Sequence, residues 1–263
     1  MAPDTLSLAG KVAIVTGSGR ENGIGASIAK TLARNGAAVT INYVSESSAV
    51  KAEKVAQSIR DEFGVGVALV RANVATPEGC DKIVSETLSQ LGVDHVDILV
   101  NNAGVVEACT LAQADRALLE RIFGVNVYGT IFMTQAALGL GKMPRGGRVI
   151  HIGSVGSKIE APGIDVYGAS KAAQDFLTSS WARELGRSRG ITVNTVAPGV
   201  IVSDMSEDVI DIVGPFVALQ RGENRAGKPE EVADVVLFLA SEKSGWMTAQ
   251  YVAVDAGLTT TAI

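Results

Sequence analysis

The sequence predicts an α/β fold, a doubly wound parallel sheet of seven strands with helices on both faces. Short apolar runs rich in β-branched residues alternate with helical patterns almost to the last residue. This alternation indicates right-handed strand–helix–strand units, which bury a parallel sheet between two helical layers. A glycine cluster after the first run and before the first helix is typical of the same fold. A chain of 263 residues can bury one large core, so residues 1–263 are predicted to form a single domain.

The individual elements follow from these patterns. Strands are predicted at the apolar runs 11–16, 37–42, 67–71, 96–101, 148–152, 191–197 and 251–255. Helices are predicted between them at 24–35, 47–63, 77–91, 113–139, 166–186 and 229–240. Residues 203–228 break the alternation, because glycines and a proline there surround apolar residues such as Val209 and Phe216. We interpret this segment as a lid over a substrate pocket, and a packed surface insertion is the alternative.

Composition excludes several classes of protein. The net charge is −5 and no lysine or arginine block is present, which argues against binding of nucleic acid. No run of about 18 apolar residues predicts a membrane span, and the N-terminus carries no secretory leader pattern. Cys80 and Cys109 suggest buried thiols in a reducing compartment, so we expect a cytoplasmic protein. His95 and His151 lack metal-ligand spacing, and no metal site is predicted.

The first strand runs into a loop that contains Gly17, Gly23 and Gly25, and a helix follows at once. Glycines let a pyrophosphate approach the backbone, and the helix N-terminus offers free N–H groups to it. The loop therefore predicts a dinucleotide site.

The end of the second strand indicates which dinucleotide binds. An acidic residue there would hold the ribose 2′-hydroxyl and repel a 2′-phosphate. This chain has Asn42, Tyr43 and Ser45 instead, with Arg20 in the glycine loop. Arg20 can pair with a phosphate, and Asn42 and Ser45 can donate hydrogen bonds to it. We therefore predict NADPH/NADP+ as cofactor; the alternative is a solvated Arg20 that confers no preference.

Ser154, Tyr167 and Lys171 are the candidate chemical groups. Tyr167 and Lys171 are four residues apart, so a helix presents both on one face. An ammonium beside a phenol lowers its pKa and makes it a usable general acid or base. Ser154 follows a predicted strand and can bring a hydroxyl to the same point.

The motifs together resemble the short-chain dehydrogenase/reductase family over nearly the whole chain, and this resemblance implies a Rossmann fold. The resemblance is strongest to NADPH-dependent fungal naphthol reductases and 3-oxoacyl-carrier-protein reductases. It rests on the sequence Asn101-Asn-Ala-Gly104, on Asn126, on the Ser154, Tyr167 and Lys171 spacing, and on Pro198-Gly199.

The resemblance implies a role for each of these residues. Tyr167 is expected to donate a proton, Lys171 to lower its pKa and bind the nicotinamide ribose, Ser154 to hold the carbonyl oxygen, and Asn126 to support a water-mediated relay to Lys171. The expected cofactor contacts are Gly17, Arg20, Asn22, Gly23, Ile24, Asn42, Tyr43, Ser45, Asn73, Val74, Asn102, Ala103, Gly104, Tyr167, Lys171, Pro198, Gly199, Val200 and Ser203.

Some positions depart from the family pattern. The glycine loop has two extra residues between Gly17 and Gly23, which leaves open whether Arg20 or Asn22 meets the 2′-phosphate. Ala249 and Ala256 occupy positions where glycine is common.

Asp165, two residues before Tyr167, suggests two alternatives. It either lies in solvent or caps the helix, or it faces a substrate that carries a basic or amide nitrogen.

These observations predict an NADPH-dependent reductase that acts on a carbonyl of a small metabolite. An imine or iminium reductase of alkaloid-type secondary metabolism, with Asp165 at the substrate, is the alternative. A cofactor-binding scaffold without turnover is a third. The resemblance also implies a homotetramer or homodimer. We expect helices 113–139 and 166–186 to form the subunit contacts, and the alternative is an ordinary pair of core helices.

Overall fold

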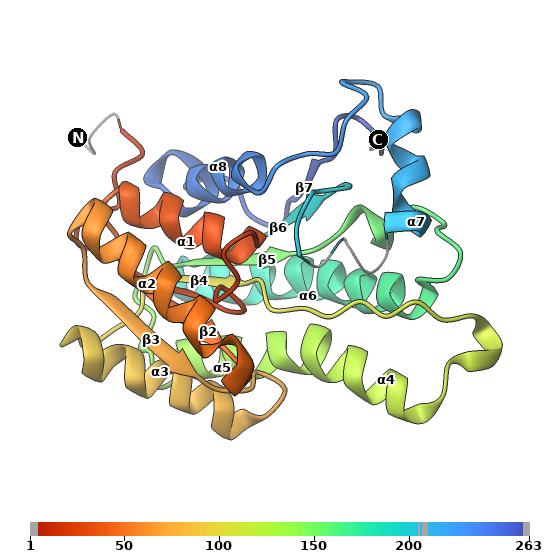
Figure 1. Cartoon of the computed structure of the whole chain (residues 1–263). Helices are drawn as coiled ribbons and strands as arrows, with labels where there is room; N and C mark the ends of the chain where they lie inside the picture. Colours follow the sequence, from red (N-terminus) through yellow and green to blue (C-terminus); the bar gives the residue numbers. More distant parts are fainter. Residues whose placement is uncertain (1–4, 205, 207–209, 260–263) are drawn as a thin grey trace.

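A seven-stranded sheet forms the centre of the computed structural model, which describes residues 5–204, 206 and 210–259. All strand pairs are parallel, and the strand order is β3-β2-β1-β4-β5-β6-β7 (Figure 1). The strands are β1 (Val12–Val15), β2 (Ala38–Tyr43), β3 (Val67–Arg71), β4 (Ile98–Asn101), β5 (Arg148–Ile152), β6 (Thr192–Pro198) and β7 (Tyr251–Val254). The predicted doubly wound fold is therefore confirmed, with strand ends within two residues of the predicted ones.

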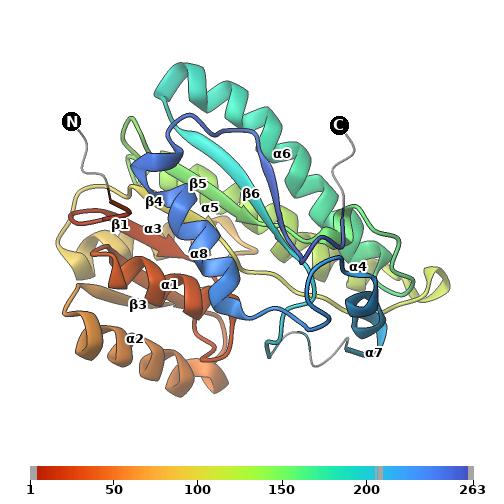
Figure 2. The ribbon, with the colours of Figure 1, turned by 90° about the horizontal axis from the view of Figure 1, so that it is seen from above.

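Helices cover both faces of this sheet and bury one apolar cluster on each (Figures 1 and 2). One layer holds α1 (Ile24–Arg34), α2 (Ala49–Phe63) and α8 (Pro229–Ala240), whose apolar residues pack on Ala13, Val15 and their neighbours. The other layer holds α3 (Pro77–Leu91), α5 (Gly129–Leu138) and α6 (Asp165–Arg189), which pack on Ile14 and Leu99. Successive strand residues point to opposite faces, which divides the core in this way.

The predicted helix 113–139 is divided in the structure. A 3₁₀ turn, η2 (Leu111–Gln113), precedes α4 (Arg116–Phe123), and the π-helical turn η3 (Gly124–Tyr128) separates α4 from α5. The apolar spacing on either side is helical, so periodicity alone does not reveal the wider turn. Such π turns commonly occur at functional sites, and η3 carries the buried Asn126.

The predicted lid, residues 203–228, contains α7 (Ile210–Val213) and the 3₁₀ segment η6 (Gly214–Leu219). A parallel bridge joins Ile201 to Gly227 and closes the base of this segment. Val209, which contributed to the prediction, lies outside the described residues.

Ala249 and Ala256 have φ angles of 62° and 52°. These left-handed conformations suit glycine better than alanine, which gives a physical reason for the glycine of the family pattern. Within the described part of the chain, no helix is long and apolar enough to cross a membrane.

Gly79 permits α3 to pack against the loop after β3. A Cβ added there would lie 1.9 Å from the carbonyl oxygen of Asn73, which is backbone and cannot easily move away. We therefore predict that Gly79→Ala lowers the free energy of unfolding by about 1–3 kcal/mol, the usual cost of overpacking. Urea denaturation measures this. Gly214→Ala is the matched control, because no atom lies within 4 Å of the added Cβ; equal stability of both variants would contradict the prediction.

Candidate active site

A cavity of about 490 Å³ opens at the carboxyl ends of the strands. Loops that follow strands β1 to β6 line it, and it spans the point between β1 and β4 where the strand order reverses. Open α/β sheets bind their ligands at this position. Of the expected cofactor contacts, the cavity is lined by Gly17, Arg20, Gly23, Ile24, Asn42, Tyr43, Ser45, Asn73, Val74, Asn102, Ala103, Gly104, Tyr167, Lys171, Pro198, Gly199, Val200 and Ser203.

The glycine loop and the start of α1 form one wall of the cavity. Gly23 is the N-cap of α1, and no side chain caps the first N–H groups of this helix. Gly17 has φ +64°, and a Cβ there would lie 2.9 Å from Cα of Ala103. The Asn102 amide braces the loop by donating to the carbonyl of Thr16 at 2.8 Å. Bare backbone next to free helical N–H groups fits the pyrophosphate of a dinucleotide.

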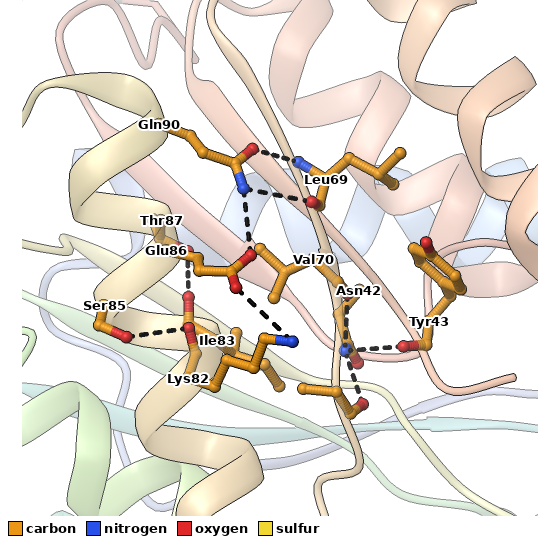
Figure 3. Close-up of polar contacts among 11 residues, drawn as sticks. Asn42, Tyr43, Leu69, Val70, Lys82, Ile83, Ser85, Glu86, Thr87 and Gln90 are labelled. Atoms are coloured by element: carbon orange, nitrogen blue, oxygen red, sulfur yellow. Dashed lines mark hydrogen bonds and ion pairs between the residues drawn. The ribbon is translucent and has the colours of Figure 1, made fainter. Parts of the chain in front are cut away.

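Asn42 does not offer its amide to a ligand, contrary to the prediction. Its Nδ2 donates to the carbonyls of Tyr43, Val70 and Ala72 at 3.4, 3.3 and 3.1 Å (Figure 3). Its Oδ1 accepts from the N–H of Gly17 at 3.0 Å. A side chain with both ends used inside the protein cannot also donate to a phosphate. Asn42 instead joins the glycine loop to the end of β2 and to β3.

Arg20, Ser45 and Ser48 remain at this end of the cavity. The Ser45 and Ser48 hydroxyls are 2.8 Å apart, and Ser48 also donates to the carbonyl of Ser45 at 2.8 Å. Asn22 is exposed and does not line the cavity, so Arg20 is the loop residue that faces it. Sequence reasoning missed Ser48, because the turn η1 (Glu46–Ser48), which brings it back beside Ser45, has no pattern of its own.

Ser154, Tyr167 and Lys171 meet on the opposite wall. Ser154 follows β5 and accepts the N–H of Gly156 at 3.0 Å, which leaves its own O–H free to donate. Tyr167 and Lys171 lie in the first two turns of α6, with the Lys171 ammonium 5.7 Å from the centre of the Tyr167 ring. Lys171 donates to the carbonyl of Ile152 at 2.8 Å and to Oε1 of Gln174 at 3.0 Å.

Burial dominates the titration of this pair. It raises the pKa of the Tyr167 phenol, and a hydrogen bond with Ser154 opposes the shift. The net shift of the Tyr167 pKa is upward, contrary to the expected lowering by Lys171, and the phenol keeps its proton at neutral pH. Burial also lowers the pKa of Lys171 to about 8, against the attraction of Asp175.

Asn126 lies next to this pair, and its side chain is fully used. Its Oδ1 accepts from the N–H of Val105 at 2.8 Å, while Nδ2 donates to Ser170 Oγ at 2.9 Å. A Cβ added at Gly104 would lie 3.4 Å from Asn126 Oδ1 and 3.5 Å from Lys171 Nζ. The two residues therefore flank the same glycine, and the relay role of Asn126 stays a prediction.

Much of the remaining cavity wall is apolar, and Ser203, Asp204 and Ser206 also line it. The apolar residues are Val105, Val106, Val155, Ile159, Ala161, Ile164, Val200, Ile201, Val213, Phe216 and Leu258. Val213 and Phe216 belong to residues 203–228, so this segment lines the same cavity as Tyr167 and Lys171. Its role as a lid stays a prediction. Asp204 is the one carboxylate among the described residues that line the cavity.

Asp165 does not reach this cavity. It is the exposed first residue of α6 and makes no capping hydrogen bond to that helix. A carboxylate in a first helical turn favourably meets the positive end of the helix dipole. The structure thus gives no support to the expectation that Asp165 contacts the substrate. Among the residues described, no group of three His, Cys, Asp or Glu side chains is placed to hold a metal ion.

Comparison with known proteins agrees with this geometry. A family model described as "Enoyl-(Acyl carrier protein) reductase" matches residues 17–259. The chain belongs to the short-chain dehydrogenase/reductase family. Short-chain dehydrogenase/reductase FrzI of Cladobotryum is 38% identical, with 97% of this chain and 98% of FrzI covered. The 3-oxoacyl-[acyl-carrier-protein] reductase FabG of Staphylococcus aureus is 38% identical, with 94% and 98% covered.

A solved structure extends the comparison. A blue fluorescent protein from a metagenomic library, crystallised in complex with NADPH, superimposes with a TM-score of 0.88. It is 37% identical, and the match covers 97% of this chain and 100% of that protein. The chain is therefore an oxidoreductase of this family, as the sequence predicted.

The lowered pKa of Lys171 predicts a pH limit on activity. The ammonium is present below a pH of about 8 and is lost as pH rises through that value. We predict that kcat/KM, assayed in the direction of reduction, falls above pH 8, because the free enzyme then loses the charge beside Tyr167. Initial rates at constant ionic strength test this. A profile that stays flat well above pH 8 would contradict it.

Proposed function

We propose that this protein reduces a carbonyl group of a small, largely apolar molecule with NADPH. One observation carries the proposal: Ser154, Tyr167 and Lys171 share a cavity whose other end has the shape and charge for a dinucleotide phosphate. The blue fluorescent protein was crystallised in complex with NADPH, which supports the same cofactor. Arg20, without an acidic neighbour on the cavity wall there, supports the phosphorylated form.

The residues of this chain then have separate tasks. NADPH supplies the hydride. The Ser154 hydroxyl donates a hydrogen bond to the carbonyl oxygen and fixes its position. The Tyr167 phenol, still protonated at neutral pH, transfers its proton to that oxygen as negative charge develops. The Lys171 ammonium stabilises the resulting phenolate and offers its remaining N–H to the cofactor ribose.

The substrate class follows from the apolar wall. Val155, Ile164 and Phe216 surround the space beyond Tyr167 and exclude water from a bound carbonyl. We propose that residues 203–228 cover this space as a substrate lid. The imine alternative was based on Asp165, which does not line the cavity.

We propose in addition that the protein is a homodimer or homotetramer located in the cytoplasm. Leu119 of α4, Tyr128 of η3 and Phe176 of α6 are 40%, 51% and 73% exposed, and α6 packs against both of the other elements. Apolar side chains left exposed on adjacent helices support burial against a second copy.

NADPH should bind at least tenfold more tightly than NADH. This ratio corresponds to about 1.4 kcal/mol, which one charge-assisted contact can supply. Arg20→Ala should remove most of the difference by weakening NADPH binding alone. Titration calorimetry with both dinucleotides gives the affinities, and Asn22→Ala is the control in the same loop. Equal affinities in the unmodified protein would refute the proposed selectivity.

Tyr167→Phe should lower kcat for a carbonyl substrate by about 100-fold or more, as expected for a lost general acid. The affinity for NADPH should change little, because the phenol serves the reacting oxygen. Steady-state rates and cofactor titration of the same preparation measure both quantities. Near-normal turnover by the variant would show that the proton comes from elsewhere.

A further inference from the structure

Gln174 is a fully buried polar side chain one turn after Lys171 on α6. Its Oε1 accepts the Lys171 ammonium at 3.0 Å, and its Nε2 donates to Thr130 Oγ1 at 2.7 Å. An ammonium can only donate, so this orientation of the amide is the one that chemistry permits. Both ends of Gln174 are therefore used, and its position is fixed from two sides.

Thr130 of α5 connects Gln174 to Asn126 of the π-helical turn η3. Its hydroxyl accepts from Gln174 and donates to the backbone carbonyl of Asn126 at 2.9 Å. The hydrogen bonds thus run in one direction from Lys171 through Gln174 and Thr130 to Asn126. This chain joins α6 to the π-helical turn η3 without a water molecule.

Lys171 has few charged neighbours. Asp175, also on α6, raises its pKa, but that carboxylate is already paired with Lys158 at 3.1 Å and bonded to Ser157 at 2.7 Å. His151 of β5 faces Lys171 from the sheet and is neutral, because burial and Lys171 lower its pKa to about 3. Tyr167 is protonated at neutral pH. The groups that bond directly to the ammonium, Gln174 and the Ile152 carbonyl, are uncharged acceptors.

We propose that Gln174 is a positioning residue for the reaction. It holds the Lys171 ammonium in one place, consumes a second N–H beside the one that Ile152 binds, and so directs the third at the cavity. Its neutral amide supports the ammonium without the counter-charge of a carboxylate. The inference rests on the proposed function, because it assigns Gln174 to the residues that serve NADPH and the carbonyl.

Substitution at residue 174 separates this role from mere helix packing. Gln174→Glu retains the shape and puts a carboxylate beside the ammonium, which should raise the pKa of Lys171 by about one unit or more. The alkaline limb of kcat/KM should move up by the same amount. Gln174→Leu removes the acceptor, so the limb should move down and NADPH affinity at pH 7 should fall several-fold. A purely structural role would lower stability without moving the limb.

Two further variants control the test. Thr130→Val should move the limb in the same direction as Gln174→Leu but less, and Thr130→Ser should restore it, because only the hydroxyl is needed. Gln250→Glu adds the same charge at an exposed position, where the side-chain amide donates to the carbonyl of Thr248, and it should leave the limb unchanged. Thermal unfolding of each variant shows whether it is folded. If Gln174→Glu does not fold, the pH profile of Thr130→Val tests the proposal in its place.

Two measurements are made on each variant. The pH profile of kcat/KM uses a carbonyl substrate, and the pH dependence of the NADPH dissociation constant needs no turnover. We expect the alkaline limb to move to higher pH for Gln174→Glu and to lower pH for Gln174→Leu. Profiles that coincide with the unmodified protein in both measurements would overturn the role of Gln174 and leave the reductase assignment intact. NADPH binding without turnover of any carbonyl would overturn the reductase assignment alone, and absence of NADPH binding would overturn both.

Discussion

The buried ammonium of Lys171 is the interaction on which the site depends. A charge inside a protein is costly unless hydrogen bonds replace the water that it has lost. Here the carbonyl of Ile152, at the end of β5, and the amide of Gln174 supply them. The ammonium thereby connects the end of the sheet to α6 and lies beside Tyr167. Its charge is kept close to the phenol that we propose as the proton donor.

The parallel sheet explains why this ammonium and the glycine loop lie on opposite walls of one cavity. All seven strands end at the same edge, so residues from distant parts of the sequence meet there. The strand order reverses between β1 and β4, which leaves room between the loops on either side. The glycine loop after β1 is held by the Asn42 and Asn102 side chains. Hydrogen bonds thus hold the glycine loop in place without a ligand, and such preorganisation reduces the entropy lost on binding.

The fold and most of the site could be predicted from the sequence, because they depend on local patterns. Alternating apolar runs and helices predict a parallel, doubly wound sheet of seven strands, and the spacing of Tyr167 and Lys171 places a hydroxyl and an amine on one helix face. What could not be predicted depends on tertiary contacts. The π-helical turn at Asn126 interrupts a helical pattern without a sequence signal. The direction in which the pKa of Tyr167 shifts depends on its burial.

The roles of individual polar residues also depend on tertiary contacts that the sequence does not reveal. Asn42 was predicted to be a phosphate ligand, because it lies at the end of a strand beside the glycine loop. Its amide instead donates to three backbone carbonyls, those of Tyr43, Val70 and Ala72. Asp165 is close to Tyr167 in sequence, but the first turn of α6 directs it to solvent. Ser48 and Gln174 were missed because a single polar residue gives no pattern until its neighbours in space are known.

The most direct test of this account is the titration of Lys171 itself. Carbon-13 labelling of the lysine ε-carbons allows the pKa to be followed by NMR in the protein without cofactor, with Lys171→Met identifying the resonance. The account predicts a pKa of about 8 for Lys171. A value at the ordinary lysine level of about 10.4 would contradict it, because the ammonium would then not be buried among neutral acceptors.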